Sequence, residues 1–118
     1  MQFSEELQVL ETSIKDSIWR MHSDRLGYPP SSVTCTFLKS LDLIISIERS
    51  RSVAEQFLLK QEKLQLAQET GIAINQILKN EISRVLNSDF DLPIAEVVFL
   101  KPVGIDKFSL WVVADSQR

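Results

Sequence analysis

Hydrophobic residues near the start of the chain recur every three or four positions, as they do along one face of an amphipathic helix. They are Leu7, Leu10, Ile14, Ile18 and Met21. Ser4 ahead of Glu5 and Glu6 suits a helix N-terminus, because a hydroxyl caps the first amides and carboxylates favour the positive end of the dipole. Gly27 and the prolines that follow it cannot continue a helix. We therefore predict a helix over residues 4–25.

The hydrophobic period then changes to two, which is typical of half-buried strands. Two alternating runs, separated only by Lys39 and Ser40, predict a β-hairpin over residues 33–48. Two further strands are predicted at residues 94–100 and 107–114, joined by a loop. Together with a long helix between the hairpins, the order is α-β-β-α-β-β. It predicts an α+β, two-layer sandwich in one domain, residues 1–118, with an antiparallel four-stranded sheet and the helices on one face.

The long helix covers residues 52–87 and begins with a capping box, Ser52-Val53-Ala54-Glu55. Its core stripe on a helical wheel contains Val53, Phe57, Leu64, Ala67, Gly71, Ile74, Leu78, Ile82 and Val85. A second, narrower row lies roughly opposite and contains Leu59, Leu66, Ala73 and Ile77. An unbroken helix of this length would measure about 50 Å, against a diameter of roughly 35 Å for a compact domain of this size. We therefore expect a bend near Gln61 and a homodimer in which the second row meets its symmetry mate; otherwise this row covers the first helix or is scattered surface apolarity.

Composition indicates a globular protein, with 44% hydrophobic and 25% charged residues. The net charge of −3 gives no general attraction to nucleic acid, so RNA or DNA binding is not expected. The single cysteine, Cys35, fits a reducing compartment. The sequence contains no signal peptide and no apolar run of about 20 residues, so we expect a cytoplasmic protein without direct membrane insertion.

Residues able to carry out catalysis are sparse. His22 is the only histidine and has no ligand partner at metal-binding spacing. Cys35 shares the apolar face of its strand with Val33 and Phe37, where a cysteine is usually a core residue. The carboxylates lie at element ends, and the three glycines form no phosphate-binding fingerprint. We expect no enzyme activity, no catalytic residue, no metal and no cofactor.

The last two strands carry hydrophobic residues on both faces, and the helices can cover only one of them. Phe99, Trp111 and Val113 are therefore candidates for an exposed sheet face. Aromatic residues on a sheet can stack unpaired RNA bases, but such a platform needs basic neighbours. Only a few basic residues lie near, at strand ends, so burial against another protein is the favoured interpretation.

Several short motifs occur in a recognisable arrangement. They are a Gly/Pro loop at residues 27–33, a hairpin turn near Asp42, the Ser52-Val53-Ala54-Glu55 helix start, a long helix and a final hairpin. In this arrangement the chain resembles a small bacterial family described as the C component of the Na+-translocating membrane potential-generating system. It departs from the family pattern at Tyr28-Pro29, where Arg-Gly is usual, and at residues 62–64, where a glycine is usual.

This resemblance implies a soluble accessory or regulatory protein of a membrane system for cation or bicarbonate uptake, with a membrane transport protein as partner and no catalytic residues. The Gly/Pro loop, with Gly27, Tyr28, Pro29 and Pro30, is a candidate functional loop. A competing hypothesis is a sensor domain that binds a small molecule between the sheet and the helices.

Overall fold

The structure, a computed structural model, describes residues 2–100 and 106–115. Within these residues, three helices and four strands follow one another. In order, they are α1 (Gln2–Leu26), β1 (Ser32–Phe37), β2 (Leu43–Glu48), α2 (Val53–Lys60), α3 (Leu64–Asp89), β3 (Ile94–Phe99) and β4 (Lys107–Ala114).

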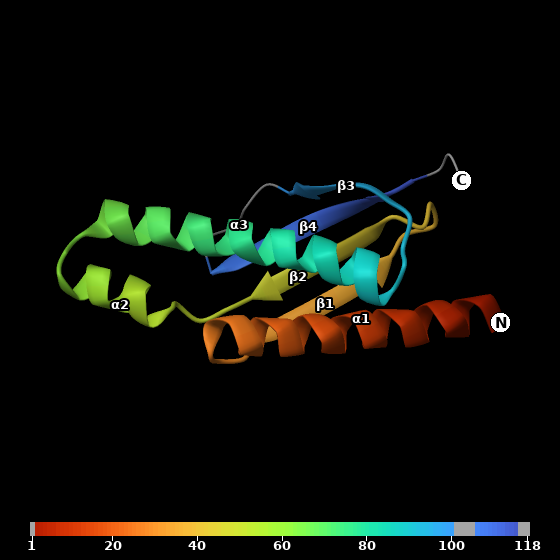
Figure 1. The fold of residues 1–118 in the computed structure, drawn as a ribbon, viewed down its shortest axis with the longest axis horizontal. Helices are drawn as coiled ribbons and strands as arrows, with labels where there is room; N and C mark the ends of the chain where they lie inside the picture. The colour runs from red at the N-terminus through yellow and green to blue at the C-terminus, as the bar shows by residue number, and fades with distance from the viewer. Residues whose placement is uncertain (1, 101–105, 116–118) are drawn as a thin grey trace.

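The strands form one antiparallel sheet in the order β1-β2-β4-β3. Helices α1 and α3 lie against the same face of this sheet (Figure 1). The predicted two-layer α+β fold is therefore confirmed, with one difference. The single long helix of the prediction is divided into α2 and α3, so the order is α-β-β-α-α-β-β.

The core lies between the two layers. Alternate residues of the central strands, among them Ile45 and Leu110, have no exposed surface. The helix stripe opposite them includes Ile14 and Ile18 of α1 and Leu78 and Ile82 of α3, which are equally buried. The predicted apolar stripe of the first helix is thus confirmed at its centre.

The break between α2 and α3 is a Schellman motif, in which backbone amides beyond the helix end bond back to its last carbonyls. The amide of Glu62 donates to the carbonyl of Leu59, and the amide of Lys63 donates to that of Leu58. Glu62 has φ of 59°, the left-handed conformation that usually selects glycine. The expected bend near Gln61, which is the C-cap of α2, therefore occurs without a glycine.

The break lets α2 fold back beside the first turns of α3, and this hairpin extends beyond the end of the sheet (Figure 1). The molecule is consequently elongated, with extents of 53 × 24 × 23 Å. Three residues expected in the core stripe, Val53, Phe57 and Leu64, are instead 82%, 59% and 61% exposed. The expectation was wrong because one continuous wheel was applied to two helices, and because no sheet lies beneath this end.

Candidate functional site

Several large apolar side chains of α2 and α3 are exposed to solvent. We call this set the hairpin patch. Its members are large hydrophobic side chains between 48% and 82% exposed: Val53, Phe57, Leu64, Leu66, Ile72 and Ile77. Leu66 and Ile77 lie on one side of α3, whereas Leu64 lies on nearly the opposite side. Concentrations of exposed apolar side chains of this kind mark contact sites more often than isolated ones do.

The predicted second row of the long helix is only partly continuous. Leu66, Ala73 and Ile77 lie exposed on α3, with spacings of seven and four residues that keep them on one side of the helix. Leu59 lies on α2, is half-buried, and lines a cavity of about 320 Å³ with Leu64 and Ala67. Leu59 is therefore not a member of that surface row, because the break at residues 61–63 separates it from α3.

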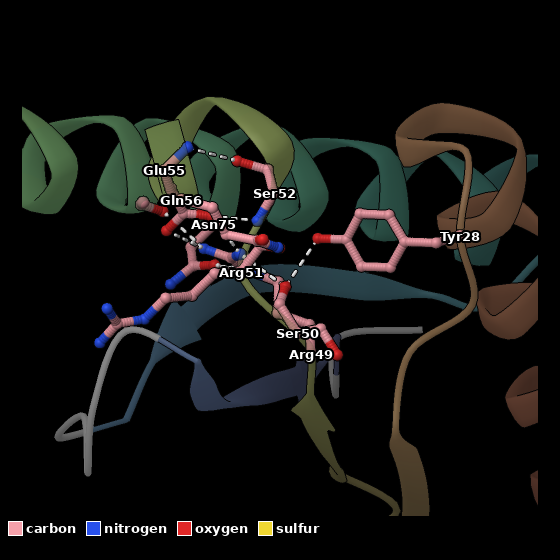
Figure 2. A network of polar contacts seen from close by, with 9 residues as sticks. Tyr28, Arg49, Ser50, Arg51, Ser52, Glu55, Gln56 and Asn75 are labelled. Atoms are coloured by element: carbon pink, nitrogen blue, oxygen red, sulfur yellow. Dashed lines mark hydrogen bonds and ion pairs between the residues drawn. The ribbon is translucent and has the colours of Figure 1, made fainter. Parts of the chain in front are cut away.

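A buried arginine holds the hairpin to the sheet (Figure 2). Arg49 follows β2, and its side chain has no exposed surface. Its Nη1 donates to Glu55 Oε1 at 2.7 Å and its Nη2 donates to Glu55 Oε2 at 3.3 Å, so the two side chains form a bidentate ion pair. Its Nε donates to Asn75 Oδ1 at 2.9 Å, and Nη2 also reaches the carbonyl of Gly71 at 3.3 Å. One guanidinium thus joins the end of β2 to both helices of the hairpin.

Glu55 has a second role as the acidic member of the predicted capping box. The amide of Ser52 donates to its Oε1 at 2.8 Å, while the amide of Glu55 donates to Ser52 Oγ at 3.2 Å. Burial raises the pKa of the Glu55 carboxyl, but the hydrogen bonds from Arg49 and Ser52 and the charge of Arg49 outweigh it, so the pKa lies below 4.5. Glu55 is therefore ionised at neutral pH and balances the buried charge of Arg49.

Arg49 and Asn75 are absent from the candidate residues drawn from the sequence, although the pattern contained a signal for both. Arg49 continues the parity of Leu43, Ile45 and Ile47, which places it on the buried face of β2. Asn75 lies one helical turn after Gly71 on the buried side of α3. A polar residue in a buried register is normally paired, and here the two are bonded to each other.

The candidate loop at residues 27–30 packs against this network. Gly27 has φ of +80°, and Pro30 is buried. The hydroxyl of Tyr28 donates to the carbonyl of Ser50 at 2.7 Å, one residue from Arg49 (Figure 2). His22 Nδ1 donates to the carbonyl of Tyr28 at 3.0 Å, and the two rings meet edge to face. Through Tyr28 the loop supports the segment that leads into α2.

The face of the sheet away from the helices carries Trp111 and Val113, with Val98 directly opposite Trp111. The indole Nε1 of Trp111 donates to Asp42 Oδ2 at 2.9 Å. Phe99 lies on the other face: it pairs with Leu110 and its ring packs edge to face on Phe108. The expectation for Phe99 was wrong because the strand register, which the sequence does not specify, sets Val98 rather than Phe99 beside the tryptophan.

A larger cavity of about 730 Å³ lies at the end of the molecule opposite the hairpin, and we call it the end cavity. Its walls come from the first turns of α1, the β1–β2 turn, the α3–β3 connection and the end of β4. Apolar residues dominate these walls, including Leu7, Leu10, Phe37, Leu92, Ile94 and Val112. Asp42 and Asp115 are the charged residues among them.

The remaining candidates show no activated group. Burial, and then the charge of Glu11, raise the pKa of the Cys35 thiol to about 12, so this cysteine is a poor nucleophile. Within the described ranges, residues 2–100 and 106–115, no three side chains of the metal-binding types gather into a site. Over the same ranges, no helix combines the length and the apolar character that crossing a membrane requires.

These observations define a two-layer α+β domain with a projecting apolar hairpin and a separate apolar cavity. The chain belongs to the family described as the Na+-translocating membrane potential-generating system (MpsC), whose model matches residues 6–98. The resemblance drawn from the sequence motifs is thereby confirmed. No curated protein matches the chain, and no solved structure matches it.

Proposed function

We propose that the protein is a non-enzymatic, cytoplasmic accessory subunit of a Na+-translocating membrane potential-generating system, and that it acts as a homodimer. The observation that carries this proposal is the hairpin patch, since six large apolar side chains of α2 and α3 remain in contact with water. Such exposure is unfavourable by about 25 cal/mol for each Å² of apolar surface, so a partner that covers it gains that energy.

The geometry of α3 favours a second copy as that partner. Its 26 residues span about 39 Å, and the row of Leu66, Ala73 and Ile77 runs along its outer side. A two-fold axis beside this row would bring the same surface of two copies together, which is the commonest symmetry of soluble homo-oligomers. The spacing of seven between Leu66 and Ala73 also suits packing between two helices.

The ion pair beneath the patch supports the same proposal. Because Arg49 joins both helices of the hairpin to the sheet, the patch is ordered before any partner arrives. A partner therefore does not have to supply the free energy for ordering it, and this preorganisation favours stable association.

Charge insertion into the patch tests the dimer. We expect the native protein to sediment as a dimer at micromolar concentration, and the double variant Leu66→Glu/Ile77→Glu to sediment as a monomer with an unchanged circular dichroism spectrum. Val9→Glu is the matched control, because Val9 is a 67% exposed apolar residue on α1, away from the hairpin. A monomeric native protein at tens of micromolar, or a variant that remains dimeric, would contradict the proposal.

The transport role requires a measurement in the native cell. We expect loss of the protein either to lower the Na+-dependent membrane potential or to make growth depend on added bicarbonate. A potential-sensitive dye measures the first effect, and growth with and without bicarbonate measures the second. The native gene should restore both properties, and the Leu66→Glu/Ile77→Glu variant, at equal protein level, should not. A deletion strain with unchanged potential and growth would refute the accessory role.

A further inference from the structure

We propose that the end cavity binds a peptide segment of the membrane partner in which apolar side chains alternate with lysine or arginine. This inference rests on the proposed function, since it names the chemistry of the partner that an accessory subunit would contact. The site is distinct from the hairpin patch and lies at the other end of the long axis.

The shape of the cavity suits apolar anchors. Its volume of about 730 Å³ is within the range of cavities that bind ligands in proteins. Leu10 approaches from α1, Leu92 from the α3–β3 connection, and Val112 from the sheet. Leu10 and Leu92 are only partly buried, so room remains beside them for inserted apolar groups.

The charges around the cavity favour a ligand with positive charge. Asp42 in the β1–β2 turn and Asp115 after β4 line the cavity, and Glu6 and Asp91 are the sequence neighbours of its lining residues Leu7 and Leu92. Among the described residues at the same positions, Lys39 is the one basic side chain. Opposite charge on a partner would be attracted across this rim, and an anionic lipid or fatty acid would be repelled.

Asp42 shows that the negative charge is built into the fold. Its Oδ1 accepts from the amide of Ala114 at 2.8 Å, and its Oδ2 accepts from Trp111 Nε1 at 2.9 Å. These hydrogen bonds, that of Ala114 first, hold the pKa of Asp42 below its ordinary value. A carboxylate has room for further hydrogen bonds, so Asp42 can also accept from a cationic group at the rim.

The extent of the surface favours a peptide over a small molecule. Leu41 of the lining is 47% exposed, and Leu38, in the turn beside the cavity, is 40% exposed, so apolar surface continues past the cavity mouth at Leu38. The carboxylates are likewise spread over several segments instead of being gathered at one point. Cytoplasmic segments beside membrane-spanning helices combine apolar residues with an excess of lysine and arginine, which is the complementary chemistry.

The proposal is tested by fluorescence anisotropy with a labelled peptide in which pairs of leucine residues alternate with pairs of lysine residues. We expect saturable binding to the full chain that weakens as salt is raised. Filling the cavity with Ala114→Phe should weaken binding at least about tenfold, as expected for the loss of about 1.4 kcal/mol. Glu6 is exposed, so Glu6→Lys should weaken binding several-fold without a change in the melting temperature. This second variant keeps the test decisive if Ala114→Phe does not fold.

Three peptide-binding results would each overturn the inference. They are no binding of the peptide, equal binding of a control peptide in which glutamate replaces lysine, and unchanged binding by both variants. Binding of an uncharged apolar dye that the peptide does not displace would assign the cavity to a small molecule and would also overturn it. Leu66→Glu/Ile77→Glu is the control that should bind the peptide normally, so failure of the cavity proposal is distinguishable from failure of the proposed dimer.

Discussion

Replacing Glu55 by glutamine removes one charge from the buried network and preserves the size of the side chain. In the native protein the guanidinium of Arg49 is fully buried, and Glu55 is its ion-pair partner among the described residues. Asn75 and Gly71 provide further hydrogen bonds to Arg49, but they provide no charge. The variant therefore leaves a buried cation without a counter-charge.

Removing one partner of a buried ion pair typically costs about 3–5 kcal/mol. We expect the lower end, about 3 kcal/mol, because glutamine can still accept one hydrogen bond from Arg49 and can still serve as the third residue of a capping box. For a protein of this size that cost corresponds to a fall of roughly 12 °C in melting temperature. The matched control is Ser52→Ala, which removes the capping hydroxyl alone and should cost about 1 kcal/mol.

Urea unfolding at several pH values distinguishes the ion pair from a packing effect. Because the pKa of Glu55 is lowered in the folded state, its contribution to the free energy of unfolding is complete above about pH 4.5 and is lost as the pH falls through the native pKa. The difference in the free energy of unfolding between the native protein and Glu55→Gln should therefore shrink on acidification. The corresponding difference between the native protein and Ser52→Ala should persist. A penalty for Glu55→Gln below about 1 kcal/mol at pH 7, or one that does not change with pH, would refute this reasoning.

Three further outcomes follow from local features. Glu62→Gly should raise the free energy of unfolding by about 0.5–1 kcal/mol, because glycine takes the left-handed conformation without the strain of a Cβ; no gain in urea unfolding would contradict the role given to Glu62. Burial, reinforced by the charge of Arg49, lowers the pKa of His22 against the raising effect of its bond to Tyr28, so stability should fall as the pH drops below 6.5. His22→Gln should remove this slope, since His22 is the only histidine; a slope that persists would exclude His22 as its source. Cys35, whose thiol pKa is about 12, should react with a thiol reagent at pH 8 at least tenfold more slowly in the native protein than in urea; equal rates would contradict its burial.

Much of the fold was accessible from the sequence because local signals agreed with the final packing. The alternation of Val33 and Leu43 with polar neighbours predicted both strands of the first hairpin, and Ser52 with Glu55 predicted the start of α2. Such agreement is expected where periodicity, capping and burial all favour the same element.

The parts that the sequence did not disclose depend on tertiary geometry. The length of the predicted helix indicated a bend near Gln61, but not that α2 would turn back onto α3, an arrangement stabilised by packing of α2 on α3 and by the ion pair of Arg49 with Glu55. The position of Phe99 depended on which residues of β3 and β4 are partners, a choice that a bulge near Glu96 also affects. Neither can be obtained from the pattern of a single element.

The two proposed surfaces lie at opposite ends of a molecule whose longest extent is 53 Å. If two copies associate through their hairpins, the α1 N-termini and the end cavities face outward at the two ends of the dimer (Figure 1). Each copy then presents one acidic, apolar cavity to a membrane partner. Binding of the first partner segment would raise the effective concentration of the second site, so weak individual contacts would sum to a stable assembly. Leu66→Glu/Ile77→Glu should therefore reduce association with a membrane that displays many partner segments. The same variant should still bind an isolated peptide in each cavity with unchanged affinity.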